Sequence, residues 1–319
     1  MSMAAAPDRS VTIAICTFRR DHIARTLASL AGLDVPQDVA VDVVVADNDT
    51  VPSAQERVER ASQGLPFPVS YVHAPASNIS IARNACLDRA TGRYLAFLDD
   101  DEVVARQWLA ALLDRAAEGG ADAVLGPVEA VYGPQAPGWM RDGDFHSSAP
   151  VFVKGEILTG YTCNVLIDRR SAAVEGLRFD LARGRSGGED TAFFRALTLR
   201  AGRIDYAPEA LVREDVPEGR ASFGWLARRR LRMGQTHGQL LAETHRAGAA
   251  RAKAAGVAAA KVAACGLLAL RHAFSPVERR RSVLRGILHA GAIGGLFGMR
   301  ALTQYGGQAD ARPGGAHAA

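Results

Sequence analysis

The chain of 319 residues has room for one large domain, or for one domain of about 200–250 residues with an appendage. A hydrophobic fraction of 48% and a charged fraction of 23% are ordinary for a globular protein and exclude a disordered or fibrous chain. The net charge is only +4, the aromatic fraction is 6% and zinc-finger spacing is absent, so we expect no nucleic-acid partner.

Strands and helices alternate through the first part of the chain. Runs of apolar, often β-branched residues predict strands, and apolar residues at helical spacing predict helices between them. The predicted strands are 11–18, 39–49, 68–75 and 93–102, and the predicted helices are 19–33, 53–63 and 78–91. This alternation is typical of an α/β domain with a mostly parallel sheet. In such sheets ligands bind beyond the carboxyl ends of the strands, where Asp47 and Asp99 both lie.

The pattern changes after residue 123. Residues 123–133, 162–168 and 203–215 read as strands, and 187–202 reads as a helix that follows two glycines. Between the first two strands lies a long loop, 133–148, rich in Gly, Pro and aromatic residues. Long loops in compact domains are often functional.

The chain becomes helical and basic from Phe223. Two apolar segments, 255–270 and 283–299, are each shorter than the roughly 20 residues that a spanning helix needs. They contain basic residues and flank the basic sequence RHAFSPVERRR. We therefore expect interfacial or re-entrant helices at a membrane surface, the alternative being two packed soluble helices.

Four separated cysteines and the N-terminal sequence bear on location. Cys16, Cys86, Cys163 and Cys265 stand in apolar surroundings without a CxxC pair, which predicts buried free thiols and fits a reducing cytoplasm. The N-terminal sequence MSMAAAPDRS has no basic region followed by an apolar run, so we expect no secretory signal there.

The sequence FLDDDE places four acids at the end of a predicted strand. Asp99 and Asp101, at i and i+2, can hold a hard cation such as Mg²⁺ or Mn²⁺, usually shared with substrate phosphates. The alternative is a solvated acidic loop in which Asp100 or Asp101 caps a helix over 103–116.

Other polar residues stand at neighbouring strand ends and helix starts. Arg83, in the predicted helix that follows the third strand, can pair with phosphate or form a structural bridge to Asp99 or Asp47. In GGED, Asp190 is either a general base or a partner of the helix dipole, and the sequence alone does not separate the two.

The ordered set VTIAICTFRR, VVADND, NISIARN, FLDDDE and GGED resembles the family 2 inverting glycosyltransferases, over roughly residues 10–235. The resemblance is closest to bacterial exopolysaccharide enzymes of the succinoglycan type. It implies the GT-A fold, a nucleotide-binding domain. The predicted organisation is a disordered N-terminus (1–9), a GT-A domain (10–235), a membrane-associated helical region (236–305) and a disordered tail (306–319).

The resemblance also implies roles for single residues. Asp190 matches the catalytic base, Asp101 the metal ligand, and Asp99 a metal ligand nearer the ribose. The implied nucleotide-binding residues are Thr17, Phe18, Asp47, Arg83 and Asp99. Instead of the usual strand-end motif Asp-Asp-Gly-Ser the chain has DNDT. It lacks the late histidine that relatives use for the metal, so Glu214 or Asp215 would replace it. The processive Gln-x-x-Arg-Trp motif is also missing, which predicts transfer of a single sugar.

Arginines and an aromatic loop complete the expected site. Arg220, Arg228 and Arg229 would neutralise the diphosphate leaving group, unless they form a solvated or membrane-facing helix surface. Trp139, Asn164 and Glu189 are predicted on the acceptor side, with loop packing as the alternative for Trp139.

We therefore expect an inverting glycosyltransferase that needs Mg²⁺ or Mn²⁺ and acts at the cytoplasmic face of the bacterial inner membrane, or otherwise in the cytoplasm. It would use a nucleotide-sugar donor and a saccharide acceptor, lipid-linked if the apolar helices bind membrane. Two alternatives are a nucleotidyltransferase, although CTFRRDH lacks the Gly-rich loop typical of that class, and a noncatalytic nucleotide-sugar-binding protein.

Overall fold

The computed structural model describes residues 9–244 and 247–299, and contacts divide the chain into two compact units. Among the described residues, unit 1 consists of 9–128 and 149–214. Unit 2 consists of residues 129–148 and 215–302. The predicted disordered tail, 306–319, and all but Arg9 of the predicted disordered N-terminus lie outside the described residues. The predicted domain boundary at residue 235 falls inside helix α7 (Phe223–Thr244).

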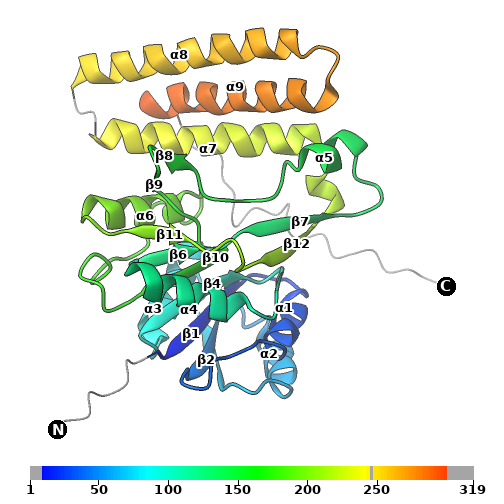
Figure 1. The fold of residues 1–319 in the computed structure, drawn as a ribbon, viewed down its shortest axis with the longest axis vertical. Helices are drawn as coiled ribbons and strands as arrows, with labels where there is room; N and C mark the ends of the chain where they lie inside the picture. The colour runs from blue at the N-terminus through cyan, green and yellow to red at the C-terminus, as the bar shows by residue number, and fades with distance from the viewer. Residues whose placement is uncertain (1–8, 245–246, 300–319) are drawn as a thin grey trace. The chain divides into compact units, whose positions relative to one another are not determined.

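Unit 1 is built around a seven-stranded sheet of order β11-β6-β10-β4-β1-β2-β3 (Figure 1). The neighbours of β1, β2 and β3 run parallel, as do β11 and β6, while β10 runs antiparallel to β4 and β6. The prediction of an α/β domain with a mostly parallel sheet is therefore confirmed. The strands are β1 (Val11–Thr17), β2 (Val41–Asp47), β3 (Val69–His73), β4 (Tyr94–Asp99), β6 (Ala123–Leu125), β10 (Asn164–Asp168) and β11 (Ile204–Tyr206).

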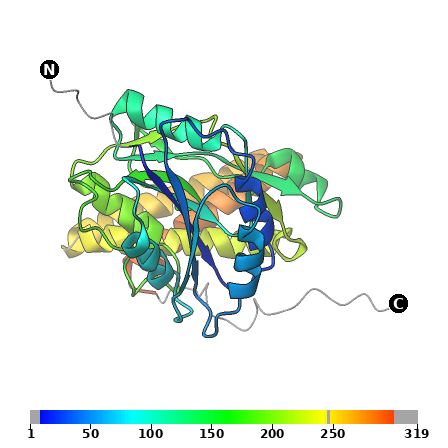
Figure 2. The same ribbon diagram turned by 90° about the horizontal axis from the view of Figure 1, so that it is seen from below.

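Helices cover both faces of this sheet (Figure 2). Alternate residues of β1 point to opposite faces, so Ile13 and Ile15 join one buried cluster and Ala14 joins the other. Helices α1 (Ile23–Leu30), α2 (Gln55–Ser62) and α4 (Trp108–Gly119) contribute to the first cluster, and helices α3 (Ile79–Arg89) and α6 (Glu189–Leu199) contribute to the second. Continuous burial on both faces explains why these strands are apolar throughout.

Short strands alter the predicted elements around the acids. Residues Glu102–Val104 form strand β5, which pairs with β12 (Val212–Val216), so Glu214 lies opposite Glu102. Helix α4 begins only at Trp108, after Gln107. The alternative in which Asp100 or Asp101 caps a helix over 103–116 is therefore wrong, because pairing with β12 keeps residues 102–104 extended.

Two predicted strands are divided. The strand predicted over 123–133 splits at Gly126–Pro127 into β6 and β7 (Val128–Tyr132), and the one over 203–215 splits into β11 and β12. Strands β8 (Phe152–Val153) and β9 (Glu156–Ile157) form a small hairpin. The predictions joined the apolar runs on the two sides of each break, although Gly126-Pro127 and Pro208 are turn signals that mark the breaks in the sequence.

Unit 2 is helical. It contains a 3-10 turn (Glu218–Arg220) and helices α5 (Gly138–Gly143), α7 (Phe223–Thr244), α8 (Gly248–Arg271) and α9 (Pro276–Leu296). Helices α7 and α9 approach closely at paired glycines, because a Cβ on Gly234 would lie 2.0 Å from the carbonyl oxygen of Leu288, and one on Gly291 2.2 Å from that of Leu231. Such close approach between helix backbones requires glycine at these positions.

Helix α8 is longer than the apolar segment predicted at 255–270. Within the described ranges it is the one helix whose length and composition would suit a membrane crossing, although such a helix is weak evidence by itself. Its most apolar 18-residue window has a mean hydropathy of 1.6, and only 11% of that window is buried. The prediction that this segment is too short to span a bilayer is thus wrong on length, because residues 248–254 and Arg271 extend the helix beyond the apolar run.

Candidate active site

The predicted acids meet at one edge of the sheet in unit 1. The strand register places Thr17 beside Asp47 and Cys16 beside Asp99, so the carboxyl ends of β1, β2 and β4 form a row. The loop Asp100–Asp101 continues directly from β4. Acids separated by about fifty positions in the chain are therefore brought to one side, as the parallel sheet predicts.

Asp100, which the sequence left without a role, anchors this loop. Its Oδ2 accepts a hydrogen bond of 2.7 Å from Thr17 Oγ1, and its carbonyl oxygen accepts one of 2.9 Å from Thr26 Oγ1. Burial raises the pKa of the Asp100 carboxyl to about 7, although the positive charge of Arg20 opposes the rise. Asp100 thus holds the turn rather than facing a ligand, and Thr17 is committed to it.

Arg20 lies directly against the proposed metal ligand. Its Nη1 donates to Asp101 Oδ2 and lies 3.6 Å from Asp100 Oδ1. The Asp101 side chain is only 11% exposed, so this contact is largely shielded from water. Arg20 was not among the predicted site residues. Two arginines after one strand end and four acids after another are nevertheless a sequence signal of charge complementarity.

Glu102 and Glu214 face each other across the β5–β12 pair. The Glu102 side chain is fully buried, and its Oε2 accepts a 2.9 Å hydrogen bond from the Asp99 backbone N–H. Its other oxygen, Oε1, has no hydrogen-bond partner within the described part of the chain. Burial raises the pKa of Glu102 well above its ordinary value, and Asp99 adds to the rise. Glu102 therefore fixes the turn that carries Asp99, a role the sequence did not indicate.

Asp47 is fully buried and both its oxygens bind the chain itself. Oδ1 accepts from the Asp49 N–H at 3.0 Å, and Oδ2 accepts from the Ala54 N–H at 2.8 Å and from the Tyr71 hydroxyl at 2.7 Å. These bonds shape the loop after β2. Contact between Asp47 and a nucleotide base stays a prediction.

The second acid of DNDT pairs with the first arginine after β1. Arg19 Nε donates to Asp49 Oδ2 at 2.8 Å, and Arg19 Nη2 lies 2.8 Å from Oδ1. The hydrogen bond from Arg19 lowers the pKa of Asp49 to about 2. The Arg19 guanidinium also lies over the ring of Phe18, 5.2 Å from its centroid. The nucleotide role of Phe18 stays a prediction.

Arg83 and Glu189 form a buried ion pair beside the acids. Arg83 Nη1 donates to Glu189 Oε1, whereas Glu189 Oε2 has no hydrogen-bond partner among the described residues. Burial raises the pKa of Glu189, with Arg83 opposing, and burial also raises the pKa of Asp99, with Arg83 again opposing. Arg83 therefore forms a structural ion pair, as one alternative predicted, but its partner is Glu189 and not the expected Asp99 or Asp47. Its contact with a nucleotide stays a prediction.

Asp190 follows Glu189 at the start of α6. Its Oδ1 accepts hydrogen bonds from the Thr191 N–H at 2.6 Å and from Thr191 Oγ1 at 3.2 Å. No hydrogen bond reaches Oδ2 within the described ranges, and the Asp190 charge contributes to the raised pKa of Asp99. One carboxylate oxygen is thus held by Thr191. The role of Asp190 as a general base stays a prediction.

Asn164, predicted on the acceptor side, is fully buried at the start of β10. Its Oδ1 accepts from Trp108 Nε1 at 2.8 Å, and its Nδ2 donates to the carbonyl oxygens of Pro127 at 2.9 Å and Ala210 at 2.7 Å. These bonds connect β10 to three other segments of unit 1, so Asn164 has a structural role in holding them together. Its contact with an acceptor stays a prediction.

The predicted diphosphate arginines lie in unit 2. The guanidinium carbons of Arg220 and Arg229 lie 5.7 and 5.3 Å from the ring centroid of Trp225, whereas Arg228 is exposed. His146 stacks on the same tryptophan with ring centroids 5.2 Å apart. Two of the three arginines therefore gather at one aromatic side chain, and contact with a diphosphate stays a prediction.

The acids fit a cation only in part. Among residues 9–244 and 247–299, no three His, Cys, Asp or Glu side chains are placed together as a ready metal site. Asp99 and Asp101 nevertheless offer the hard oxygen donors that Mg²⁺ and Mn²⁺ prefer, and the Arg20 guanidinium already lies as a cation against Asp101. The residues therefore fit a cation that phosphate oxygens also coordinate, rather than one enclosed by protein ligands alone.

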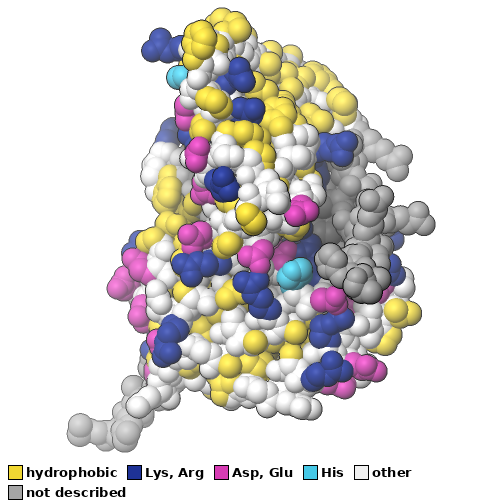
Figure 3. All heavy atoms as spheres, turned by 90° about the vertical axis from the view of Figure 1, so that its right-hand side faces the viewer, with side chains coloured by type: hydrophobic (Ala, Val, Ile, Leu, Met, Phe, Trp, Pro, Cys, Tyr) yellow, Lys and Arg dark blue, Asp and Glu magenta, His cyan; other side chains and the backbone are white. Residues whose placement is uncertain are grey.

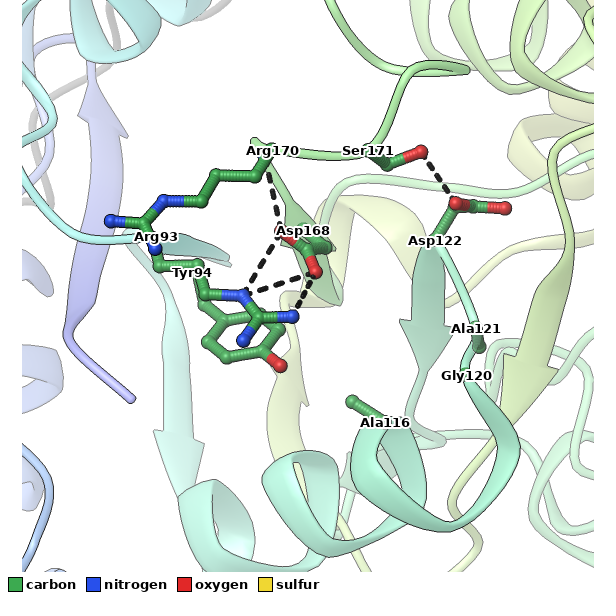
Figure 4. A pocket seen from close by; sticks show the side chains of 9 residues that line it. All are labelled: Arg93, Tyr94, Ala116, Gly120, Ala121, Asp122, Asp168, Arg170 and Ser171. Carbon is green, nitrogen blue, oxygen red and sulfur yellow. Dashed lines mark hydrogen bonds and ion pairs between the residues drawn. The ribbon is translucent and has the colours of Figure 1, made fainter. Parts of the chain in front are cut away.

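A separate cavity of about 380 Å³ lies at the other end of β4, beside Tyr94 and Asp168 (Figure 4). Its charged groups bind one another: Arg93 Nη2 lies 2.7 Å from Asp168 Oδ2, and Ser171 Oγ donates to Asp122. Because these groups are satisfied and lie at the amino end of the strand, we exclude the cavity from the active site.

A mostly parallel sheet with acids and arginines gathered at its carboxyl edge defines an α/β protein of the class that binds ligands beyond the strand ends. Residues 12–174 match the family described as Glycosyl transferase family 2. The chain is 53% identical to the succinoglycan biosynthesis protein ExoM of Rhizobium meliloti (strain 1021) over 296 residues, which cover 93% of this chain and 96% of that protein. The protein therefore belongs to glycosyl transferase family 2.

Solved structures support the same fold. The mannosyltransferase PcManGT from Pyrobaculum calidifontis, in complex with GDP-Man and Mn²⁺, matches with a TM-score of 0.60 and 22% identity, over 92% of this chain and 88% of that chain. S. aureus TarS 1–349 in complex with UDP-GlcNAc matches with a TM-score of 0.50 and 21% identity, over 66% and 59%. The predictions of a GT-A-like fold and of a family 2 glycosyltransferase are confirmed, which decides against the nucleotidyltransferase.

Proposed function

We propose that this glycosyltransferase moves one sugar, with inversion, from a nucleotide sugar to a lipid-linked saccharide that is built into a surface polysaccharide. Its 53% identity to a protein named for succinoglycan biosynthesis supports this pathway class. The main support for this reaction is the position of Asp190. One of its carboxylate oxygens accepts from Thr191, and its negative charge, like that of Asp101, helps to raise the pKa of Asp99.

Asp190 is the proposed general base. Its Oδ2 would take the proton of the acceptor hydroxyl while the hydroxyl oxygen attacks the anomeric carbon. The bond between that carbon and the diphosphate oxygen breaks at the same time, and the electron pair leaves with the nucleoside diphosphate. Attack opposite the leaving group inverts the configuration. The bonds from Thr191 to Oδ1 support this role, because they fix the carboxylate before the acceptor arrives.

Asp99 and Asp101 would hold Mg²⁺ or Mn²⁺ together with the diphosphate. When bound, the cation would neutralise the charge that develops on the leaving group. Glu214 or Asp215 would be a further ligand, and the position of Glu214 opposite Glu102, which binds the Asp99 backbone, favours Glu214. Arg220, Arg228 and Arg229 are proposed to contact the diphosphate, and Thr17, Phe18, Asp47 and Arg83 to line the nucleotide site.

The acceptor side would include Glu189, Asn164 and Trp139. Helix α8, largely exposed and apolar, supports attachment to the cytoplasmic face of the bacterial inner membrane. A lipid-linked acceptor would then be presented at the surface to which the enzyme is attached.

Replacement of Asp190 by Asn tests the base. We expect Asp190→Asn to reduce sugar transfer by at least about 10³-fold, because an amide cannot accept the proton. Binding of a nucleoside diphosphate with Mn²⁺, measured as a rise in the melting temperature, is expected to stay within twofold of the wild type. Asp114→Asn is the matched control, because that carboxylate lies exposed on α4.

Unchanged turnover in Asp190→Asn would exclude Asp190 as the base. A screen of nucleotide sugars with Mn²⁺ for thermal protection would identify the donor, since a ligand that binds only the folded state raises its stability. If no nucleotide protects the wild type, the nucleotide-sugar assignment fails. If nucleotides protect but neither protein transfers sugar to any lipid extract, the noncatalytic alternative is favoured.

A further inference from the structure

Unit 2 contains a cavity with an unusual combination of walls. Its volume is about 580 Å³, and the residues that line it include Pro137, Trp139, Phe223 and Val283 on the apolar side. Arg279 and Arg280, from the first two turns of α9, line it as well. The walls therefore offer an apolar surface and two permanent positive charges to the same occupant.

The arginine run 279–281 is divided between two roles. Arg281 is structural: its Nη1 pairs with Glu278 Oε1 at 2.7 Å, and its Nη2 donates to the Gly143 carbonyl oxygen at 2.9 Å. Arg279 and Arg280 each use one nitrogen on a backbone carbonyl, Ala273 and Pro276, both at 3.0 Å. In the described part of the chain neither has a carboxylate partner, so most of their donors are left for an anion.

The aromatic wall is held in place. The Arg280 guanidinium carbon lies 4.4 Å from the Trp139 ring centroid, and Trp139 also meets the edges of Phe145 and Phe223, with centroids 5.2 and 6.5 Å apart. This contact orients the Arg280 charge at the side of the cavity. A cation fixed beside an aromatic wall suits a ligand that has an anionic head and a hydrocarbon chain.

The chain next to the cavity provides a path for such a hydrocarbon. Arg279 reaches back to Ala273, which is adjacent to Phe274, and the Phe274 side chain is fully exposed at 101%. Leu267 and Leu270, at the end of α8, are 69% and 73% exposed. Figure 3 shows hydrophobic and basic side chains together on the helical part of the molecule. The apolar side chains thus continue from the arginines toward the proposed membrane face.

We propose that this cavity binds the diphosphate head and the first part of the hydrocarbon chain of the lipid that carries the acceptor saccharide. The inference rests on the proposed function, and it adds a site for the lipid portion of the acceptor. Arg279 and Arg280 bind the diphosphate, and Trp139, Phe223 and Val283 contact the chain. Such a site anchors the acceptor by its carrier and leaves the saccharide available for transfer.

Farnesyl diphosphate serves as the probe, and the full-length protein is used in a neutral detergent. We expect it to bind with an affinity at least tenfold higher than farnesol or inorganic diphosphate, and to change the fluorescence of Trp139. The double variant Arg279→Gln/Arg280→Gln is expected to lose roughly tenfold or more in affinity, because two charge-assisted contacts are removed. Arg271→Gln, an exposed arginine at the end of α8 outside the cavity, is the control and stays within twofold.

Three results would overturn the proposal. The first is equal binding of farnesyl diphosphate by the double variant and the wild type. The second is displacement by a nucleoside diphosphate with Mn²⁺, which would place the probe in the nucleotide site. The third is displacement of farnesyl diphosphate by phosphatidylglycerol at equal concentration, which would assign the cavity to bulk anionic lipid. Because Asp190→Asn is expected to keep farnesyl diphosphate binding, failure of the base and failure of the lipid site are separable.

Discussion

Arg20 and Asp101 form an ion pair in the loop that carries the acids after β4. The Arg20 guanidinium neutralises Asp101 and lies near Asp100, so the repulsion among the acids is relieved without a metal. A divalent cation that binds Asp101 must compete with this permanently charged group. Arg20 therefore sets how tightly the empty enzyme holds a cation, and a diphosphate that attracts Arg20 would favour cation binding.

We expect Arg20→Gln to bind Mn²⁺ alone about tenfold or more tightly than the wild type, since the competing charge is removed. Electron paramagnetic resonance of free Mn²⁺, measured without nucleotide, gives this affinity directly. Arg106→Gln is the control, because Arg106 pairs with Asp34 at the surface. Weaker or unchanged Mn²⁺ binding in Arg20→Gln would show that Asp101 is not shared between the two cations.

His146 is a buried neutral group in unit 2. Its Nε2 lies 3.2 Å from the Arg220 carbonyl oxygen and its Nδ1 3.2 Å from the Tyr132 hydroxyl, an arrangement that a neutral ring with hydrogen on Nε2 satisfies. Burial lowers the pKa of His146 to about 4, and the charges of Arg229 and Arg220 lower it further. Protonation therefore costs more in the folded state than in the unfolded state.

Between about pH 6.5 and pH 4 the unfolded chain binds more protons at this histidine than the folded chain does. The stability due to neutral His146 is present above about pH 6.5 and is lost as the pH falls toward 4, by up to about 3 kcal/mol. We expect His146→Gln to lack this component, as measured by the difference between wild-type and variant unfolding free energies across that range. Parallel pH curves for the two proteins would contradict the assignment.

The sequence predicted the site residues by type and strand position but not by their partners. Asp99, Asp101 and Asp190 could be proposed because acids at strand ends and helix starts converge in a parallel sheet. The contacts of Arg20, Glu102 and Glu189 could not, because each depends on which loop folds over which strand end. The residues next to each of these side chains in the sequence do not indicate which distant residue it will contact.

At the scale of elements, the α7–α9 pair depends on glycines that face each other. Gly→Ala in an exposed helix normally stabilises by up to about 1 kcal/mol. At Gly291 the new methyl group would lie 2.2 Å from the Leu231 carbonyl oxygen, so the two helices would have to separate. We expect Gly291→Ala to destabilise unit 2 by about 1–3 kcal/mol, the range for overpacking, and to increase amide hydrogen exchange in α7 and α9.

Gly266→Ala provides the matched control. This glycine lies on α8, and nothing is within 4 Å of the position that its Cβ would take. The substitution should leave exchange in α7 and α9 unchanged and slow exchange in α8. Slower exchange in all three helices for Gly291→Ala would mean that the close approach of α7 and α9 is not required.

Element types followed from sequence periodicity more reliably than their ends. The central strands and the helices between them were predicted because both faces of the sheet are buried and the apolar runs are long. Strand β5 was not predicted as a separate strand: Glu102 was placed at the end of the strand 93–102, and one alternative placed residues 103–104 in a helix. Residues 102–104 pair with Val212–Glu214, more than a hundred positions later. Local periodicity cannot represent that pairing.

At the scale of the whole molecule, charge is divided unevenly between the units. By sequence, the ranges of unit 2 contain sixteen Lys and Arg against seven Asp and Glu, a net charge of +9, and the rest of the chain carries −5. An apolar exposed helix in a basic unit suits an anionic membrane surface. The total of +4 conceals this division.

We expect the protein to bind vesicles that contain phosphatidylglycerol and to lose at least about tenfold in affinity between 0.1 and 0.5 M NaCl, because salt screens the basic surface. Co-sedimentation with vesicles measures both values. Phe274→Ser should weaken binding at both salt concentrations without affecting folding, since that side chain is fully exposed. Equal binding to pure phosphatidylcholine vesicles, with no effect of salt, would exclude an electrostatic contribution of the basic unit to membrane binding.

The discontinuous make-up of unit 2 has a consequence for protein synthesis. Residues 129–148 emerge from the ribosome before the second half of unit 1, but Met140 and Phe145 are buried against Leu226 and Leu284, which are translated much later. Until then this apolar segment has no partner, and it is a natural site for chaperone binding or aggregation. A fragment ending after β12 would keep the segment permanently exposed. Any attempt to produce the catalytic unit alone must therefore also replace residues 129–148.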